Sequence, residues 1–129
     1  VLCVSKKYRR GGMQMLSAEL LSFIGGNLII KNMVDRLRPC QIDETVSLIV
    51  KIPFDSSFPS GHTLNGITAA VTLMFIDKRM GIPAIVLAVL IAFSRMYNFM
   101  HFPTDVLAGA VLGVVSAVFV NYLFKRAGN

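Results

Sequence analysis

Residues 106–124 read VLAGAVLGVVSAVFVNYLF, an almost unbroken apolar stretch that ends at the basic pair Lys125-Arg126. A helix needs roughly 20 mainly apolar residues to cross the hydrocarbon core of a bilayer, and this stretch is long enough to do so. Bases mark the points where such helices leave the membrane on the cytoplasmic side. The stretch therefore predicts a transmembrane helix.

Three further apolar segments precede this one, at about residues 13–30, 63–76 and 82–93, and charge, proline or glycine bounds each of them. The segments 63–76 and 82–93 are shorter than a bilayer core and cross it only if their polar ends are included. Buried helices of a soluble protein are the alternative for those two. Four apolar segments in one short chain nevertheless favour an all-α, polytopic transmembrane helical bundle with four spans.

The composition agrees with a membrane protein and with a single domain over residues 1–129. Hydrophobic residues make up 54% and charged residues 16%, and the mean hydropathy is +0.64. Soluble domains average about 45–50% apolar and about 25% charged residues, so this chain is neither an ordinary soluble domain nor disordered. The net charge is +6, but the bases lie in short clusters between apolar runs. That distribution argues against a nucleic-acid partner.

The first residues are apolar and lack the pattern of a signal peptide. We expect the chain to be a fragment that begins at the tail of an earlier membrane span. Neither Cys3 nor Cys40 has a second cysteine or a histidine at metal-binding spacing, so both are expected to be free thiols.

The charges predict the orientation of the four spans. If the chain alternates sides, one face carries eight bases against the single acid Asp77, whereas the other face is balanced. The positive-inside rule makes the basic face cytoplasmic. The bases that define it are Lys6, Lys7, Arg9, Arg10, Lys78, Arg79, Lys125 and Arg126. Within the last span, Gly109 and Gly113 form a GxxxG pattern, which indicates close helix packing rather than a ligand site.

Three groups of polar residues fall on the opposite, external face. Lys31 and Arg38 are seven residues apart, which predicts that they share one helix face, and Pro39 is expected to end that helix. The alternative is a pair of interfacial bases that extend to the headgroups.

The second group is Ser60-Gly61-His62, at the predicted start of a helix. Ser60 suits the N-cap, Gly61 permits close backbone approach, and His62 lies where a helix N-terminus binds an anion. An ordinary capping turn with an incidental histidine is the alternative.

The third group contains Arg95, His101 and Asp105. Because Asp105 follows His101 by four residues, its carboxylate is expected to reach the imidazole and fix the tautomer. The alternative is an interfacial pair that only neutralises itself. Together the three groups supply three cations, two histidines, a carboxylate and a helix N-terminus, which is an inventory for phosphoryl transfer. The histidines and the aspartate have roles in that chemistry, so no metal site is expected.

These groups resemble the three signature motifs of the type-2 phosphatidic acid phosphatase superfamily, which includes membrane lipid phosphatases and vanadium haloperoxidases. Membrane members typically have six spans, so the resemblance implies that two N-terminal spans are missing here. The motifs in this chain are Lys31-x6-Arg38-Pro39, Pro59-Ser60-Gly61-His62 and Ser94-Arg95-x5-His101-x3-Asp105.

The resemblance also implies a role for each residue. His101 attacks phosphorus and forms a phosphohistidine, with Asp105 holding its ring, and His62 protonates the leaving oxygen and then activates water. No metal or cofactor is required. The phosphate oxygens are bound by Lys31, Arg38, Arg95, Ser60 and the backbone N–H groups of Ser60 and Gly61.

We therefore expect an integral membrane lipid phosphatase of a bacterial plasma membrane, with its active site outside. Undecaprenyl diphosphate is the favoured substrate, and phosphatidic acid or phosphatidylglycerol phosphate is the alternative. A vanadate-dependent oxidase is disfavoured by the four apolar segments, and a catalytically silent lipid-binding scaffold is disfavoured by the intact motifs. The loop 40–58 is a candidate cover for the site.

Overall fold

The computed structural model describes residues 8–42 and 55–127, and every regular element within them is helical. The long first helix consists of α1 (Arg9–Ser22), the π-helical segment η1 (Phe23–Ile30) and α2 (Lys31–Val34). The other elements are α3 (Pro39–Ile42), α4 (Gly61–Ile76), α5 (Lys78–Tyr97) and α6 (Pro103–Arg126). The structure confirms the prediction of an all-α bundle.

Within the described residues, three helical segments are long and apolar enough to cross a membrane: Arg9–Ile42, Lys78–Tyr97 and Pro103–Arg126. The predicted segment 63–76 forms α4, which has 16 residues. At a rise of about 1.5 Å per residue, α4 is about 24 Å long, shorter than a bilayer core of about 30 Å. The described residues thus contain three long helices and one shorter apolar helix, and α4 is one of the two segments expected to cross the bilayer core only if its polar ends are included.

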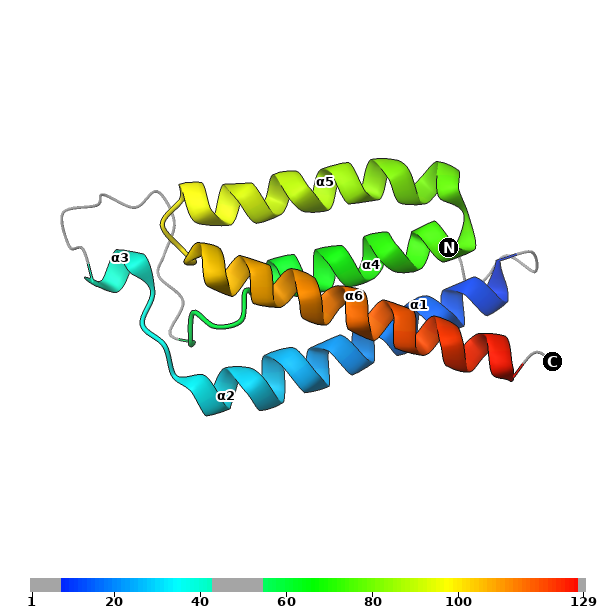
Figure 1. Cartoon of the computed structure of the whole chain (residues 1–129), viewed down its shortest axis with the longest axis horizontal. Helices are drawn as coiled ribbons and strands as arrows, with labels where there is room; N and C mark the ends of the chain where they lie inside the picture. Colours follow the sequence, from blue (N-terminus) through cyan, green and yellow to red (C-terminus); the bar gives the residue numbers. More distant parts are fainter. Residues whose placement is uncertain (1–7, 43–54, 128–129) are drawn as a thin grey trace.

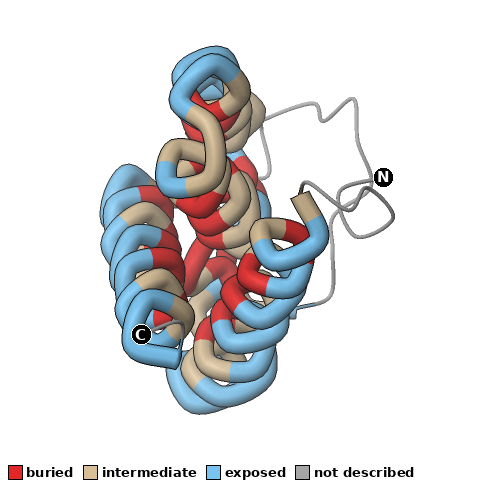
Figure 2. Tube along the Cα trace, turned by 90° about the vertical axis from the view of Figure 1, so that its right-hand side faces the viewer, coloured by how far each residue is buried: buried red, intermediate tan, exposed pale blue. Residues whose placement is uncertain are grey.

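The short helix α4 lies at the centre of the bundle and packs against α5, α6 and the first helix. Its buried side chains include Leu64, Thr68 and Thr72. The outward sides of the helices are exposed along their length, as Figure 2 shows. Large apolar side chains such as Leu90, Phe93 and Phe119 lie exposed there. An apolar exterior around a small polar core is suited to contact with lipid.

Glycines set the short distance between α4 and α6. A Cβ atom on Gly109 would lie 2.7 Å from the carbonyl oxygen of Ser60, and one on Gly113 would lie 2.7 Å from that of Leu64. Because these neighbours are backbone atoms, they cannot rotate away. The structure thus confirms that the GxxxG pattern of α6 serves helix packing.

The helices alternate in direction, so the charge clusters separate to opposite ends of the bundle (Figure 1). One end holds α3, the end of α5 and the start of α6, and the other holds the start of α1 and the end of α6. Cys40 is buried as a free thiol. The predictions for Cys3, Lys6, Lys7 and most of the loop 40–58 lie outside the described residues.

Candidate active site

The helix that carries Lys31 ends sooner than the sequence predicts. Asp35 adopts a left-handed conformation with φ 36°, so α2 stops at Val34 and Arg38 lies in the irregular segment that follows. Pro39 begins α3 instead of ending a helix, in agreement with the preference of proline for the first helical position. The prediction that Lys31 and Arg38 share one helix face is therefore wrong.

The two cations nevertheless meet at a common carboxylate, which the sequence reasoning missed. Asp55 accepts Lys31 Nζ at 2.5 Å and Arg38 Nη2 at 2.7 Å. Burial raises the pKa of Asp55, but the hydrogen bonds and charges of Lys31 and Arg38 outweigh burial and hold that pKa below its usual value. Asp55 is therefore ionised and lies between the two cations as an internal anion.

His101 is buried, and its two ring nitrogens have different partners. Nδ1 lies 2.8 Å from the carbonyl oxygen of Ser57. Because a carbonyl only accepts, Nδ1 carries the proton and Nε2 keeps its lone pair. Nε2 lies 3.2 Å from Nη1 of Arg38, which donates to it. This pattern assigns a neutral imidazole with its basic nitrogen toward the cations.

The surroundings of His101 favour that neutral state. Burial lowers the pKa of His101 to about 4, and the charge of Arg38 acts in the same direction. The backbone hydrogen bond to Ser57 and the charge of Asp105 oppose this shift. At neutral pH the imidazole is therefore uncharged, with a proton on Nδ1 and a lone pair on Nε2.

Asp105 and His101 lie within ion-pair distance, as predicted, but no hydrogen bond joins them. Their nearest atoms, Oδ2 and Nδ1, are 3.9 Å apart. Oδ2 instead accepts the Ser57 hydroxyl at 2.6 Å and the Phe102 N–H at 2.9 Å. Asp105 lies in the first turn of α6, where a carboxylate reaches back to the unpaired N–H groups of the helix start. It therefore acts on His101 through Ser57.

Arg36 is a second residue that the sequence reasoning did not select. Its Nη1 donates to Asp105 Oδ1 at 2.7 Å and to Thr104 Oγ1 at 2.9 Å, and its guanidinium lies 4.1 Å from the centre of the Phe102 ring. The Arg36 carbonyl accepts the Ser57 N–H at 2.8 Å. Arg36 thus joins the segment after α2 to the loop before α4 and to α6.

Ser60 occupies the predicted N-cap of α4, but its groups are already engaged. Its N–H donates to the Asp105 carbonyl at 3.0 Å, and its hydroxyl oxygen accepts from Thr63 Oγ1 at 3.0 Å. The expectation that the Ser60 N–H binds phosphate is therefore not met in this arrangement. A Cβ atom on Gly61 would lie 2.7 Å from Asn27 Oδ1, so glycine permits close approach to the first helix there.

His62 and Arg95 form the remaining part of the site. His62 lies in the first turn of α4, and partial burial together with the charges of Arg95, Lys31 and Arg38 lowers the pKa of its imidazole. Arg95 lies in the last turn of α5, and its buried Nε has no hydrogen-bond partner among the described residues. An unsatisfied buried donor is costly.

The structure thus brings the predicted residues to one end of the bundle, around three residues that were not predicted, Arg36, Asp55 and Ser57. Asp55 links Lys31 to Arg38, and Ser57 links His101 to Asp105. The described residues hold no group of three or more His, Cys, Asp or Glu side chains arranged to bind a metal ion.

The model of the PAP2 superfamily matches residues 11–129. The chain is 36% identical over 114 residues to the undecaprenyl-diphosphatase of Sulfolobus acidocaldarius, covering 88% of this chain and 55% of the relative. It is 31% identical over 85 residues to undecaprenyl-diphosphatase BcrC of Bacillus subtilis, covering 66% and 42%.

A solved structure has the same fold. The crystal structure of a transmembrane PAP2-type phosphatidylglycerolphosphate phosphatase from Bacillus subtilis superposes with a TM-score of 0.73 at 29% identity, covering 89% of this chain and 59% of that one. The chain spans about half the length of the curated relatives it matches. With a family match over nearly its whole length, the chain belongs to the PAP2 superfamily.

Proposed function

We propose that this chain carries the active site of a membrane lipid phosphatase that acts through a phosphohistidine on His101. The observation that carries the proposal is the buried, neutral imidazole whose Nε2 faces Arg38. A nucleophile beside a cation suits attack on a phosphate, because the cation stabilises the charge that develops on the phosphate oxygens.

In the first step, Nε2 of His101 bonds to phosphorus and the bond from phosphorus to the leaving oxygen breaks. His62 gives its proton to that oxygen, and the proton on Nδ1 of His101 stays hydrogen-bonded to Ser57. Substrate phosphate takes the place of the Asp55 carboxylate between Lys31 and Arg38, and the free Nε of Arg95 donates to it.

In the second step, water attacks phosphorus and the bond to Nε2 breaks, which releases inorganic phosphate. His62 takes the proton of the water, so both histidines return to their starting states. No step requires a metal or a cofactor. Asp105, held by Arg36, stabilises the positive charge that His101 carries in the intermediate.

Undecaprenyl diphosphate is the favoured substrate, because two of the relatives are named undecaprenyl-diphosphatases. Hydrolysis would yield undecaprenyl phosphate and phosphate. Phosphatidylglycerol phosphate is the second candidate, since the structural neighbour is named for that substrate. Phosphatidic acid remains the further alternative. The described bases of the clusters lie at the opposite end of the bundle, which supports a site at the external face of a plasma membrane; they are Arg9, Arg10, Lys78, Arg79, Lys125 and Arg126.

The test is phosphate release from these three lipids by the purified protein, with and without EDTA. We expect release from at least one lipid, no loss of turnover in EDTA, and inhibition by vanadate. Loss of activity in EDTA that a divalent ion restores would overturn the assignment of the chemistry to side chains.

Histidine variants divide the two roles. His101→Ala should abolish formation of the phosphoenzyme. His62→Ala should recover in part on a nitrophenyl phosphate, whose leaving group needs no proton, because general acid catalysis is worth about 10²–10⁴-fold. The activity of Asp105→Asn should lie between the activities of His101→Ala and His62→Ala. All three variants are first compared with the wild type for membrane insertion and thermal unfolding, and a phosphoenzyme in His101→Ala would refute the mechanism.

A further inference from the structure

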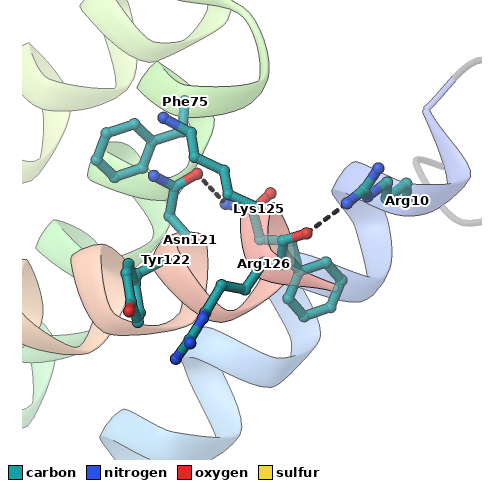
Figure 3. Close-up of a pocket in the computed structure, with 8 residues that line it drawn as sticks. Arg10, Phe75, Asn121, Tyr122, Lys125 and Arg126 are labelled. Carbon is teal, nitrogen blue, oxygen red and sulfur yellow. Dashed lines mark hydrogen bonds between the residues drawn. The ribbon is translucent and has the colours of Figure 1, made fainter. Parts of the chain in front are cut away.

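A cavity lies at the end of the bundle opposite the candidate active site. Its volume is about 600 Å³, and it opens between the start of α1, the end of α4 and the end of α6. Figure 3 shows its lining. The residues are Arg10, Gln14, Phe75, Asn121, Tyr122, Phe124, Lys125 and Arg126.

Three of the lining residues are cations and none is a carboxylate. Arg10 reaches from α1 to donate to the carbonyl of Phe124, and Lys125 extends toward Phe75 (Figure 3). The guanidinium of Arg126 lies 5.8 Å from the centre of the Tyr122 ring. Across the described part of the chain, none of the three cations forms an ion pair. Among the described residues, the lining of the cavity therefore carries positive charge that no carboxylate pairs with.

The rest of the lining combines amides with aromatic rings. Gln14 is only 8% exposed and donates through Nε2 to Asn121 Oδ1 at 3.1 Å, which fixes both amides between α1 and α6. Phe75 and Phe124 supply apolar surface beside them. The cations can bind a phosphate, and the amides can hydrogen-bond a glycerol hydroxyl. The aromatic rings can contact the first carbons of an acyl chain.

We propose that this cavity binds the anionic headgroup of a phospholipid, such as phosphatidylglycerol, in the membrane leaflet opposite the active site. Basic pockets between the cytoplasmic ends of transmembrane helices bind anionic lipid headgroups. A lipid is favoured over free phosphate because the cavity lies at the ends of membrane-spanning helices and is partly aromatic. This proposal does not rest on the catalytic assignment.

The test is lipid binding to the purified protein in detergent, measured by native mass spectrometry and by the thermal unfolding midpoint. Phosphatidylglycerol, phosphatidylcholine and soluble glycerol 3-phosphate are compared at equal concentration. We expect phosphatidylglycerol to bind and to raise the midpoint, whereas neither of the other two does. Equal effects of phosphatidylglycerol and glycerol 3-phosphate would show a site for free phosphate and overturn the proposal.

A charge-matched pair of double variants locates the binding. Lys125→Gln/Arg126→Gln removes two cations of the cavity and leaves the contact between Arg10 and Phe124 in place. Lys78→Gln/Arg79→Gln removes the same charge at the same end of the bundle, on residues that do not line the cavity.

We expect phosphatidylglycerol to bind the cavity variant at least about tenfold more weakly, and the control variant within about twofold of the wild type. Equal weakening of both would show diffuse attraction to the basic surface and refute a defined site. Unchanged binding of phosphatidylglycerol to the cavity variant would also refute a defined site in the cavity.

Discussion

His101 donates Nδ1–H to the carbonyl of Ser57, and that one bond decides which nitrogen of the ring is available for chemistry. A carbonyl does not titrate, so the tautomer is independent of the state of any neighbouring acid. Asp105 is linked to His101 through Ser57, because Oδ2 of Asp105 accepts the Ser57 hydroxyl. In the proposed mechanism, the Ser57 carbonyl would orient the ring of His101 and the Asp105 carboxylate would stabilise its positive charge.

The low pKa of His101 predicts an unusual acid tolerance for the first chemical step. An imidazole with a pKa of about 6.5 is about 97% protonated at pH 5, whereas burial lowers the pKa of His101 to about 4 and keeps most of it neutral there. We expect phosphoenzyme formation from nitrophenyl phosphate to fall less than about threefold between pH 7 and pH 5. The rate of phosphoenzyme formation is measured by single-turnover trapping and is corrected for the ionisation of nitrophenyl phosphate.

A fall of about 25-fold over the same interval, as an unshifted histidine would give, would contradict the burial argument. The parallel measurement on His62→Ala shows whether any fall belongs to His101, because the leaving group of this substrate needs no acid.

Asp55 predicts a second effect at the scale of single residues. Its carboxylate competes with phosphate for Lys31 and Arg38, so Asp55→Asn should tighten inhibition by vanadate about two- to fivefold, the range expected for an exposed ion pair. The inhibition constant is measured beside that of Asp35→Asn, which makes the same charge change at an exposed position where asparagine tolerates φ 36°. Weaker inhibition in Asp55→Asn than in the control would show that Asp55 organises the two cations.

Among the elements, α4 and α6 depend on each other through backbone contact. Gly109→Ala places a Cβ atom against the carbonyl of Ser60 and should destabilise the protein by about 1–3 kcal/mol. Gly25→Ala is the control, because a Cβ atom there meets nothing within 4 Å. Thermal unfolding in detergent compares the two, and equal midpoints would contradict the packing argument.

The helices were predictable from sequence because long apolar runs leave few alternatives. The end of the first helix was not predictable. It depends on the left-handed conformation of Asp35, and no glycine marks this position in the sequence. The roles of Ser57 and Arg36 were equally hidden. Ser57 acts mainly through a backbone carbonyl, which every residue has, and Arg36 differs from its neighbour Arg38 only in where the loop directs it.

At the scale of the whole molecule, the charge distribution predicts the orientation in the membrane. Cysteines are placed at Ile42 and Lys78, two exposed positions at opposite ends of the bundle, in a protein that carries Cys3→Ala and Cys40→Ala. An impermeant thiol reagent added to intact cells should label position 42 and not position 78. Lysed cells show that both positions react, and labelling of position 78 alone would reverse the topology.

The irregular segments at the active-site end are joined to each other by their main chains. Ser57 N–H donates to the Arg36 carbonyl, Ser60 N–H to Asp105 and Cys40 N–H to Phe99. Because Cys40 lies in α3 and Asp105 in α6, these bonds tie the loops of this end to each other and to those two helices. We expect the bonded segments to open as one cooperative unit in hydrogen exchange. We expect the amide protons of Ser57 and Ser60 to exchange at a common rate, far slower than that of Ala127 at the frayed end of α6, so the active-site floor is rigid although it is built from loops.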